Sequence, residues 1–174
     1  MIKILKEWFY KKIDFMFLKE FEVRWSDLDA NRHLSNVSYL TYAGETRMAF
    51  LKEIGFSHKN LIRLNIGPIV FNEQLFYFNE VLPDDNIQVS LELAGMSKDG
   101  TFFEFEHNFY NNKGVNVGRC EMMGGWLNIV KRKLTPLPEK MLNKFRGNFK
   151  TKTFKELRAE DTRKWNKKPK NLSK

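Results

Sequence analysis

The sequence predicts an α+β fold in which one long helix packs on a mostly antiparallel sheet. The first observation is a single long segment, residues 36–54, whose apolar side chains recur at helical spacing. The second is a set of strand-like runs, two pairs of them separated by the turn sequences Lys-Asp-Gly and Asn-Asn-Lys-Gly. The chain of 174 residues, 42% of them hydrophobic, suits one domain with a sizeable core. The helix must bury its apolar face, so we expect the sheet to cover it.

The chain begins with an expected N-terminal extension, residues 1–14. Apolar side chains recur there at helical spacing among lysines, which is typical of an amphipathic helix. Such a helix docks on the body, on a partner subunit or on a membrane surface. Alternation over residues 15–25 then predicts the first strand, and a polar loop follows over residues 26–36.

The long helix has recognisable ends. Ser35 or Asn36 caps its start, and Gly55 after Ile54 is a natural stop. Gly44 lies inside the helix at a cost of about 1 kcal/mol relative to alanine. We therefore expect another part of the backbone to approach this glycine closely, for example a strand of the sheet.

Four further extended runs follow a connector over residues 57–66. Within the last run, the pair Gly124 and Gly125 indicates a bulge or a close approach of the backbone. The four strands are expected at residues 69–79, 87–97, 101–110 and 115–130.

The basic charge of the chain is concentrated at its C-terminal end. The net charge is +9, but residues 131–174 alone hold 16 Lys and Arg against 4 Asp and Glu. Pro136 and Pro138 lie near the start of this segment and mark the end of the domain, so we expect a domain over residues 15–139 and a basic, partly helical tail over residues 140–174. The mildly acidic body argues against a nucleic-acid binder. Peripheral membrane contact through the basic termini stays open.

Several classes of protein are excluded by what the sequence lacks. A lone cysteine, Cys120, forms no disulfide framework in its own chain and fits a reducing, cytoplasmic setting. No run of 18 apolar residues is present, so no membrane-spanning helix is expected. No HExxH, CxxC or glycine-rich phosphate loop occurs, so we expect no metal and no cofactor.

The loop before the helix carries a family resemblance. Its sequence is V-R-W-S-D-L-D-A-N-R-H-L-S-N-V-S-Y-L, with E-T-R in the helix behind it and G-P-I-V, E-V-L-P-D-D and L-T-P-L-P-E further on. Over about residues 15–139 the chain resembles the hotdog-fold thioesterases, most of all the 4-hydroxybenzoyl-CoA thioesterase-type acyl-CoA hydrolases. It is also similar to the plant acyl-ACP thioesterases. The resemblance implies a hotdog fold, with an antiparallel sheet wrapped around one long central helix, and a homodimer or homotetramer.

The resemblance also implies catalytic residues. The second aspartate of D-x-D, and the D-x-N-x-H pattern, fall on Asp29, Asn31 and His33. Asp29 is then the general base or the nucleophile. A helix start offers unpaired backbone N–H groups that stabilise an oxyanion. The amides expected to bind the substrate in this way belong to Leu34, Ser35, Asn36 and Val37.

Structural roles compete with each of these assignments. Asp29 and Asn31 are residue types that commonly form turns, and His33 has the alternative of being a buried, hydrogen-bonded histidine. Asp27 is expected to be a turn or capping residue. The function that we expect is hydrolysis of acyl-CoA, or of acyl-ACP, and the many Phe suggest an apolar or aromatic acyl group. The alternative is a non-catalytic acyl-thioester binding or scaffold protein of the same fold.

Overall fold

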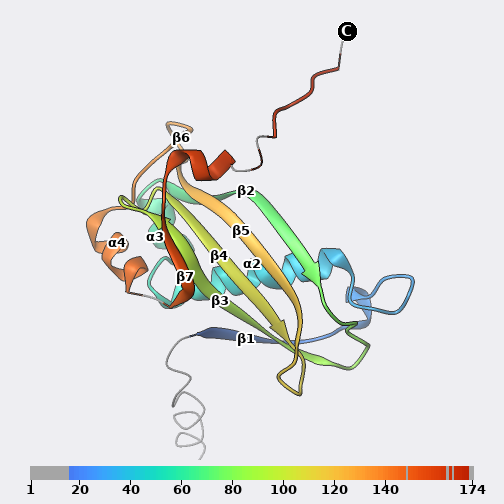
Figure 1. The fold of residues 1–174 in the computed structure, drawn as a ribbon. Helices are drawn as coiled ribbons and strands as arrows, with labels where there is room; N and C mark the ends of the chain where they lie inside the picture. The colour runs from blue at the N-terminus through green and yellow to red at the C-terminus, as the bar shows by residue number, and fades with distance from the viewer. Residues whose placement is uncertain (1–15, 148, 164, 166, 173–174) are drawn as a thin grey trace, which may run out of the picture.

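The structure is a computed structural model that describes residues 16–147, 149–163, 165 and 167–172. A curved seven-stranded sheet wraps around one long helix, α2 (Figure 1). The main path of the sheet is β1-β3-β4-β5-β2, and its pairings are antiparallel except for β7, which runs parallel to β3. The strands are β1 Phe17–Glu22, β2 Ile66–Tyr77, β3 Asn86–Ser97, β4 Phe102–Tyr110, β5 Asn116–Asn128, β6 Lys133–Leu134 and β7 Lys150–Leu157. The predicted hotdog arrangement is confirmed, while the predicted helix of residues 1–13 lies outside the described residues.

Helix α2 spans Asn36–Glu53, close to the prediction. The hydroxyl of Ser35 caps it by accepting a hydrogen bond from the amide of Ser38 at 3.2 Å, and the chain leaves it through Gly55 at φ +87°. We expected another part of the backbone to lie close to Gly44, and within this chain that prediction is wrong. A Cβ placed there would meet only the Arg47 side chain, at 3.6 Å, so an alanine would fit.

The core between α2 and the sheet combines aliphatic side chains with a cluster of aromatic rings. Helix α4, Glu139–Arg146, adds Phe145, whose ring lies 5.7 Å from the rings of Phe103 and Phe105 and 6.0 Å from that of Trp126. Leu157 of β7 is also buried. The expected boundary after residue 139 therefore does not separate the core from a tail, because the basic segment supplies a core helix and an edge strand.

The glycine pair of β5 allows a close approach, as predicted. A Cβ on Gly124 would lie 2.6 Å from the carbonyl oxygen of Ile69, and one on Gly125 would lie 3.0 Å from the Phe71 ring. The irregularity in the pairing falls on the opposite strand, since the register shifts between Val70 and Asn72 in β2. The connector after α2 also differs from expectation, because it forms a short helix, α3 His58–Arg63.

Among the described residues, no helix has both the length and the apolar character needed to cross a membrane. The short 3₁₀ helices are η1 Trp25–Asp27 and η2 Ala159–Arg163.

We predict that Phe145→Ala lowers the free energy of unfolding by about 3–5 kcal/mol, because it empties a closely packed aromatic site. Leu172→Ala, at a side chain that is 95% exposed, is the control and should change it by less than about 0.5 kcal/mol. Urea denaturation measures both variants. Equal stabilities would show that α4 is not part of the core.

Candidate active site

Asp27 organises the loop that precedes α2. Its carboxylate accepts hydrogen bonds from the backbone amide of Arg24 at 3.0 Å, from the guanidinium of the same residue at 3.0 and 3.1 Å, and from the Tyr42 hydroxyl at 2.8 Å. Its backbone carbonyl accepts from the Ser35 amide and the Ser38 hydroxyl. One buried residue therefore ties the end of β1, the loop and the first turns of α2 together, which goes beyond the turn or cap that the sequence indicates.

Asp29 closes the tip of the loop. Its Oδ1 accepts hydrogen bonds from the backbone amides of Asn31 at 2.8 Å and His33 at 3.1 Å. The bond from the His33 amide is the largest cause of a lowered pKa for this exposed carboxyl group. Asp29 is thus a turn residue, and the hydrogen bonds to Oδ1 from two backbone amides also favour its charged form.

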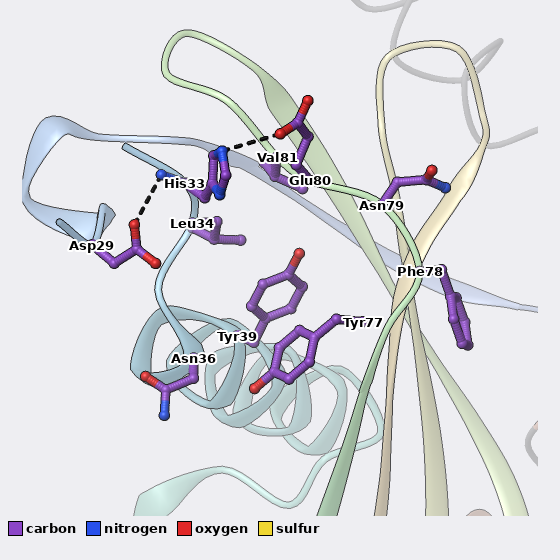
Figure 2. A pocket seen from close by; sticks show the side chains of 10 residues that line it. All are labelled: Asp29, His33, Leu34, Asn36, Tyr39, Tyr77, Phe78, Asn79, Glu80 and Val81. Atoms are coloured by element: carbon purple, nitrogen blue, oxygen red, sulfur yellow. Dashed lines mark hydrogen bonds and ion pairs between the residues drawn. The ribbon is translucent and has the colours of Figure 1, made fainter. Parts of the chain in front are cut away.

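The Asp29 loop forms one wall of a pocket of about 600 Å³ at the N-terminal end of α2 (Figure 2). The segment that follows β2 forms the opposite wall, and Tyr39 of α2 lies between them. The residues that line it are Asp29, His33, Leu34, Asn36, Tyr39, Tyr77, Phe78, Asn79, Glu80 and Val81. The structure therefore brings Asp29, His33, Leu34 and Asn36 together, and leaves Asn31, Ser35 and Val37 out of the lining.

Two of the four amides expected to bind an oxyanion are already used by the fold. The amide of Leu34 donates to the carbonyl of Val81 at 2.9 Å, and that of Ser35 donates to the carbonyl of Asp27 at 2.9 Å. The amides of Asn36 and Val37, in the first turn of α2, have no acceptor among the described residues. The candidate oxyanion site is thus reduced to these two N–H groups, and the Ser35 side chain is the helix cap.

His33 is paired with Glu80, which lies outside the D-x-N-x-H pattern and is the first residue of the E-V-L-P-D-D segment. Its Nε2 lies 3.0 Å from Oε2 of Glu80, across the mouth of the pocket (Figure 2). The alternative of a buried, structural histidine is wrong for His33, because its side chain is 40% exposed. Glu80 lies 47 positions further along the chain, and only the three-dimensional fold brings it to the loop.

The pocket floor and one wall are aromatic. Tyr39 is almost fully buried, and its ring packs edge-on against Tyr77 with centroids 5.2 Å apart. Burial raises the pKa of Tyr39 to about 12, so its hydroxyl stays protonated. Phe78 is also among the lining residues, but its ring points away from Asp29 and His33 (Figure 2). The rings of Tyr39 and Tyr77 thus form an apolar surface beside the polar Asp29 and His33.

The other ionisable residues considered for catalysis are buried or held in ion pairs. Cys120 is buried, and burial raises the pKa of its thiol to about 12, so it is not an activated nucleophile. Two ion pairs occupy the helix residues, Lys19 with Glu45 at 3.1 Å and Arg47 with Glu73 at 2.8 Å. Within the described residues, no group of three His, Cys, Asp or Glu side chains is arranged to hold a metal ion.

Comparison with known proteins shows the family to which the chain belongs. Residues 23–145 match the thioesterase-like superfamily. The protein YsmA of Bacillus subtilis is 24% identical over 91 residues, which are 52% of this chain and 58%, less than two thirds, of that protein. A Staphylococcus aureus protein solved with CoA has a TM-score of 0.72 at 17% identity, covering 90% of this chain and 96% of its own. The 1,4-dihydroxy-2-naphthoyl-CoA thioesterase of Synechocystis has a TM-score of 0.67 at 16% identity, covering 76% and 96%.

We predict that Asp27→Asn lowers the free energy of unfolding by about 1–3 kcal/mol at neutral pH. Hydrogen bonds from Arg24 and Tyr42 lower the pKa of Asp27 from its ordinary value of 3.8. The charged carboxylate therefore stabilises the fold above about pH 4, and this contribution is lost as the pH falls through the lower native pKa.

The difference in stability between wild type and Asp27→Asn should accordingly shrink below pH 4, as measured by urea denaturation across pH. Asp84→Asn is the matched control, since Asp84 is exposed in a turn with φ +66°, where asparagine is well tolerated. A difference that is independent of pH would show that the charge of Asp27 is not what stabilises the loop.

Proposed function

Because the chain belongs to the thioesterase-like superfamily, we propose that it hydrolyses acyl-CoA thioesters in the pocket at the start of α2. One observation carries the proposal. Asp29 and His33 line the same pocket as Asn36, and the open amides of Asn36 and Val37 lie in the first turn of the helix behind it. Thioester hydrolysis needs such a combination of a reactive polar group and a site for negative charge on oxygen.

The proposed reaction places the thioester carbonyl oxygen at the amides of Asn36 and Val37. The positive end of the α2 dipole and these N–H groups then stabilise the tetrahedral oxyanion. Oδ2 of Asp29 is the oxygen available to attack the carbonyl carbon or to accept a proton from water, because Oδ1 is held by two amides. If water attacks, collapse of the oxyanion releases the carboxylic acid and the free thiol. If Oδ2 attacks, collapse releases the thiolate and leaves an acyl anhydride on Asp29, which water then hydrolyses to the carboxylic acid while the thiolate takes up a proton.

The acyl group that fits best is aromatic. Tyr39 and Tyr77 present flat apolar surface to the pocket, and aromatic pairs favour stacked or edge-on packing. The Synechocystis enzyme of similar fold acts on an aromatic acyl-CoA, and the Staphylococcus aureus protein of similar fold was solved with CoA. These likenesses support CoA as the carrier, with acyl-ACP as the alternative to be tested.

A second copy of the chain is the expected partner. Among the described strands, β2 lies at one edge of the sheet and pairs with β5 alone, so its outer edge is free. It exposes a group of large apolar side chains, an arrangement that invites pairing with another strand. The exposed side chains are Val70, Phe71, Phe76 and Tyr77. Tyr77 also lines the pocket, so we propose a homodimer along β2 that encloses the active site.

We predict that the wild-type protein hydrolyses aromatic acyl-CoA faster than aliphatic acyl-CoA, and that Asp29→Asn lowers kcat by about 10²- to 10⁴-fold on every substrate. A panel of acyl-CoA and acyl-ACP thioesters with detection of the free thiol measures this. Asp84→Asn should keep wild-type rates, because that exposed aspartate lies outside the pocket.

The same panel separates hydrolysis from the alternative function. Saturable binding of CoA thioesters without turnover by the wild type would favour a non-catalytic binding or scaffold protein. Wild-type rates in Asp29→Asn would remove Asp29 from the reaction while leaving the activity in place.

We further predict that Val70→Lys halves the mass of the particle measured by analytical ultracentrifugation, because a lysine on the free edge of β2 disfavours strand pairing. Val115→Lys is the control, since Val115 has nearly the same exposure, 46% against 48% for Val70, and lies in the β4–β5 turn. A wild type that sediments as a monomer would contradict the proposed dimer.

A further inference from the structure

Glu80 and His33 form a carboxylate–imidazole pair at the mouth of the pocket (Figure 2). The carboxylate oxygen and Nε2 are 3.0 Å apart, which is hydrogen-bond distance. At neutral pH a carboxylate only accepts hydrogen bonds, so Nε2 must carry the proton. A neutral His33 ring in this pair therefore has its lone pair on Nδ1, the nitrogen that Glu80 does not engage.

The neighbouring residues hold this pair in place. Leu34, next to His33, donates its amide to the carbonyl of Val81, next to Glu80, at 2.9 Å. Leu34 and Val81 are 5% and 1% exposed, so both are anchored in the core. Asp29 adds a second restraint by accepting the His33 amide. The backbones beneath the two side chains are thus fixed relative to each other without any bound substrate.

Asp29 is poorly suited to accept the proton of an attacking water. Two backbone amides hold its Oδ1, and the pKa of the carboxyl group is lowered, chiefly by the bond from His33. A weaker base gains less by general-base catalysis near neutral pH, where an imidazole is well matched. The charge of Asp29 also acts on His33, so a protonated ring would lie between two carboxylates, Asp29 and Glu80.

We propose that His33, oriented by Glu80, is the proton-transfer group of this site, an inference that rests on the hydrolysis proposed above. Nδ1 takes one proton from water as the oxygen–carbon bond forms and the carbonyl electron pair moves to the oxygen. When the carbon–sulfur bond breaks with its electron pair on sulfur, the same proton passes to the thiolate. Acid and thiol are the products, and no other reactant is needed.

In this scheme Glu80 is a positioning residue that acts through His33. Its carboxylate selects the tautomer and favours the imidazolium that forms during the reaction, as the acid member of a serine-protease triad does. Because water is the nucleophile in this scheme, Asp29 contributes a fixed negative charge. The remaining titratable groups that line the pocket are Tyr39 and Tyr77, and burial raises the pKa of both phenols.

The test is Glu80→Gln, which keeps the hydrogen-bond acceptor and removes the charge. We expect kcat on the best acyl-CoA to fall about 10- to 100-fold while KM changes less than about threefold. The acidic limb of the pH profile of kcat/KM should move to lower pH, because a negative charge beside the imidazole is lost. Glu20→Gln is the matched control, at an exposed carboxylate on β1 outside the pocket.

An NMR measurement tests the geometry without any substrate. The ¹⁵N shifts of neutral His33 should show the proton on Nε2 in the wild type. A proton on Nδ1, or an unchanged kcat and pH profile in Glu80→Gln, overturns this inference while leaving the hydrolase in place. A wild type that hydrolyses no thioester overturns the proposed function itself.

Discussion

The anchoring of Asp27 is the interaction on which the rest of the site depends. A loop of polar residues at a helix start has many conformations, and burial of Asp27 selects one of them. Its carboxylate binds Arg24 and Tyr42, while its carbonyl binds Ser35 and Ser38. The first turn of α2 is thereby fixed against the end of β1, and the amides of Asn36 and Val37 in that turn have no acceptor among the described residues.

The pocket arises because two distant segments share a short backbone contact. The hydrogen bond from Leu34 to Val81 sets the loop beside the segment that leaves β2, and each wall then contributes a side chain next to that bond. His33 comes from one wall and Glu80 from the other. The backbone hydrogen bond between Leu34 and Val81 thus also aligns the side chains of His33 and Glu80.

The long helix and the strands β1 to β5 could be predicted because each depends on local sequence. Ser35 and Gly55 mark helix ends by their own chemistry, and Asp29 belongs to a recognisable motif. Phe145 and Glu80 could not be predicted, because nothing within a few positions of either shows that they meet Trp126 or His33. The basic character of residues 140–174 also concealed β7, where Lys155 pairs with Glu104 of β4 at 3.3 Å.

Exposure of the pocket links its chemistry to assembly. The side chains of His33 and Glu80 are 40% and 62% exposed, and an ion pair in such surroundings adds little to stability because water screens it. Their value in one chain is therefore orientation. A second chain paired along β2, as proposed, would cover Tyr77 at the pocket wall and exclude water from the same region. With less water nearby, the two carboxylates would stabilise an imidazolium more strongly. Pairing of a second chain along β2 would therefore also make the proposed base, His33, stronger.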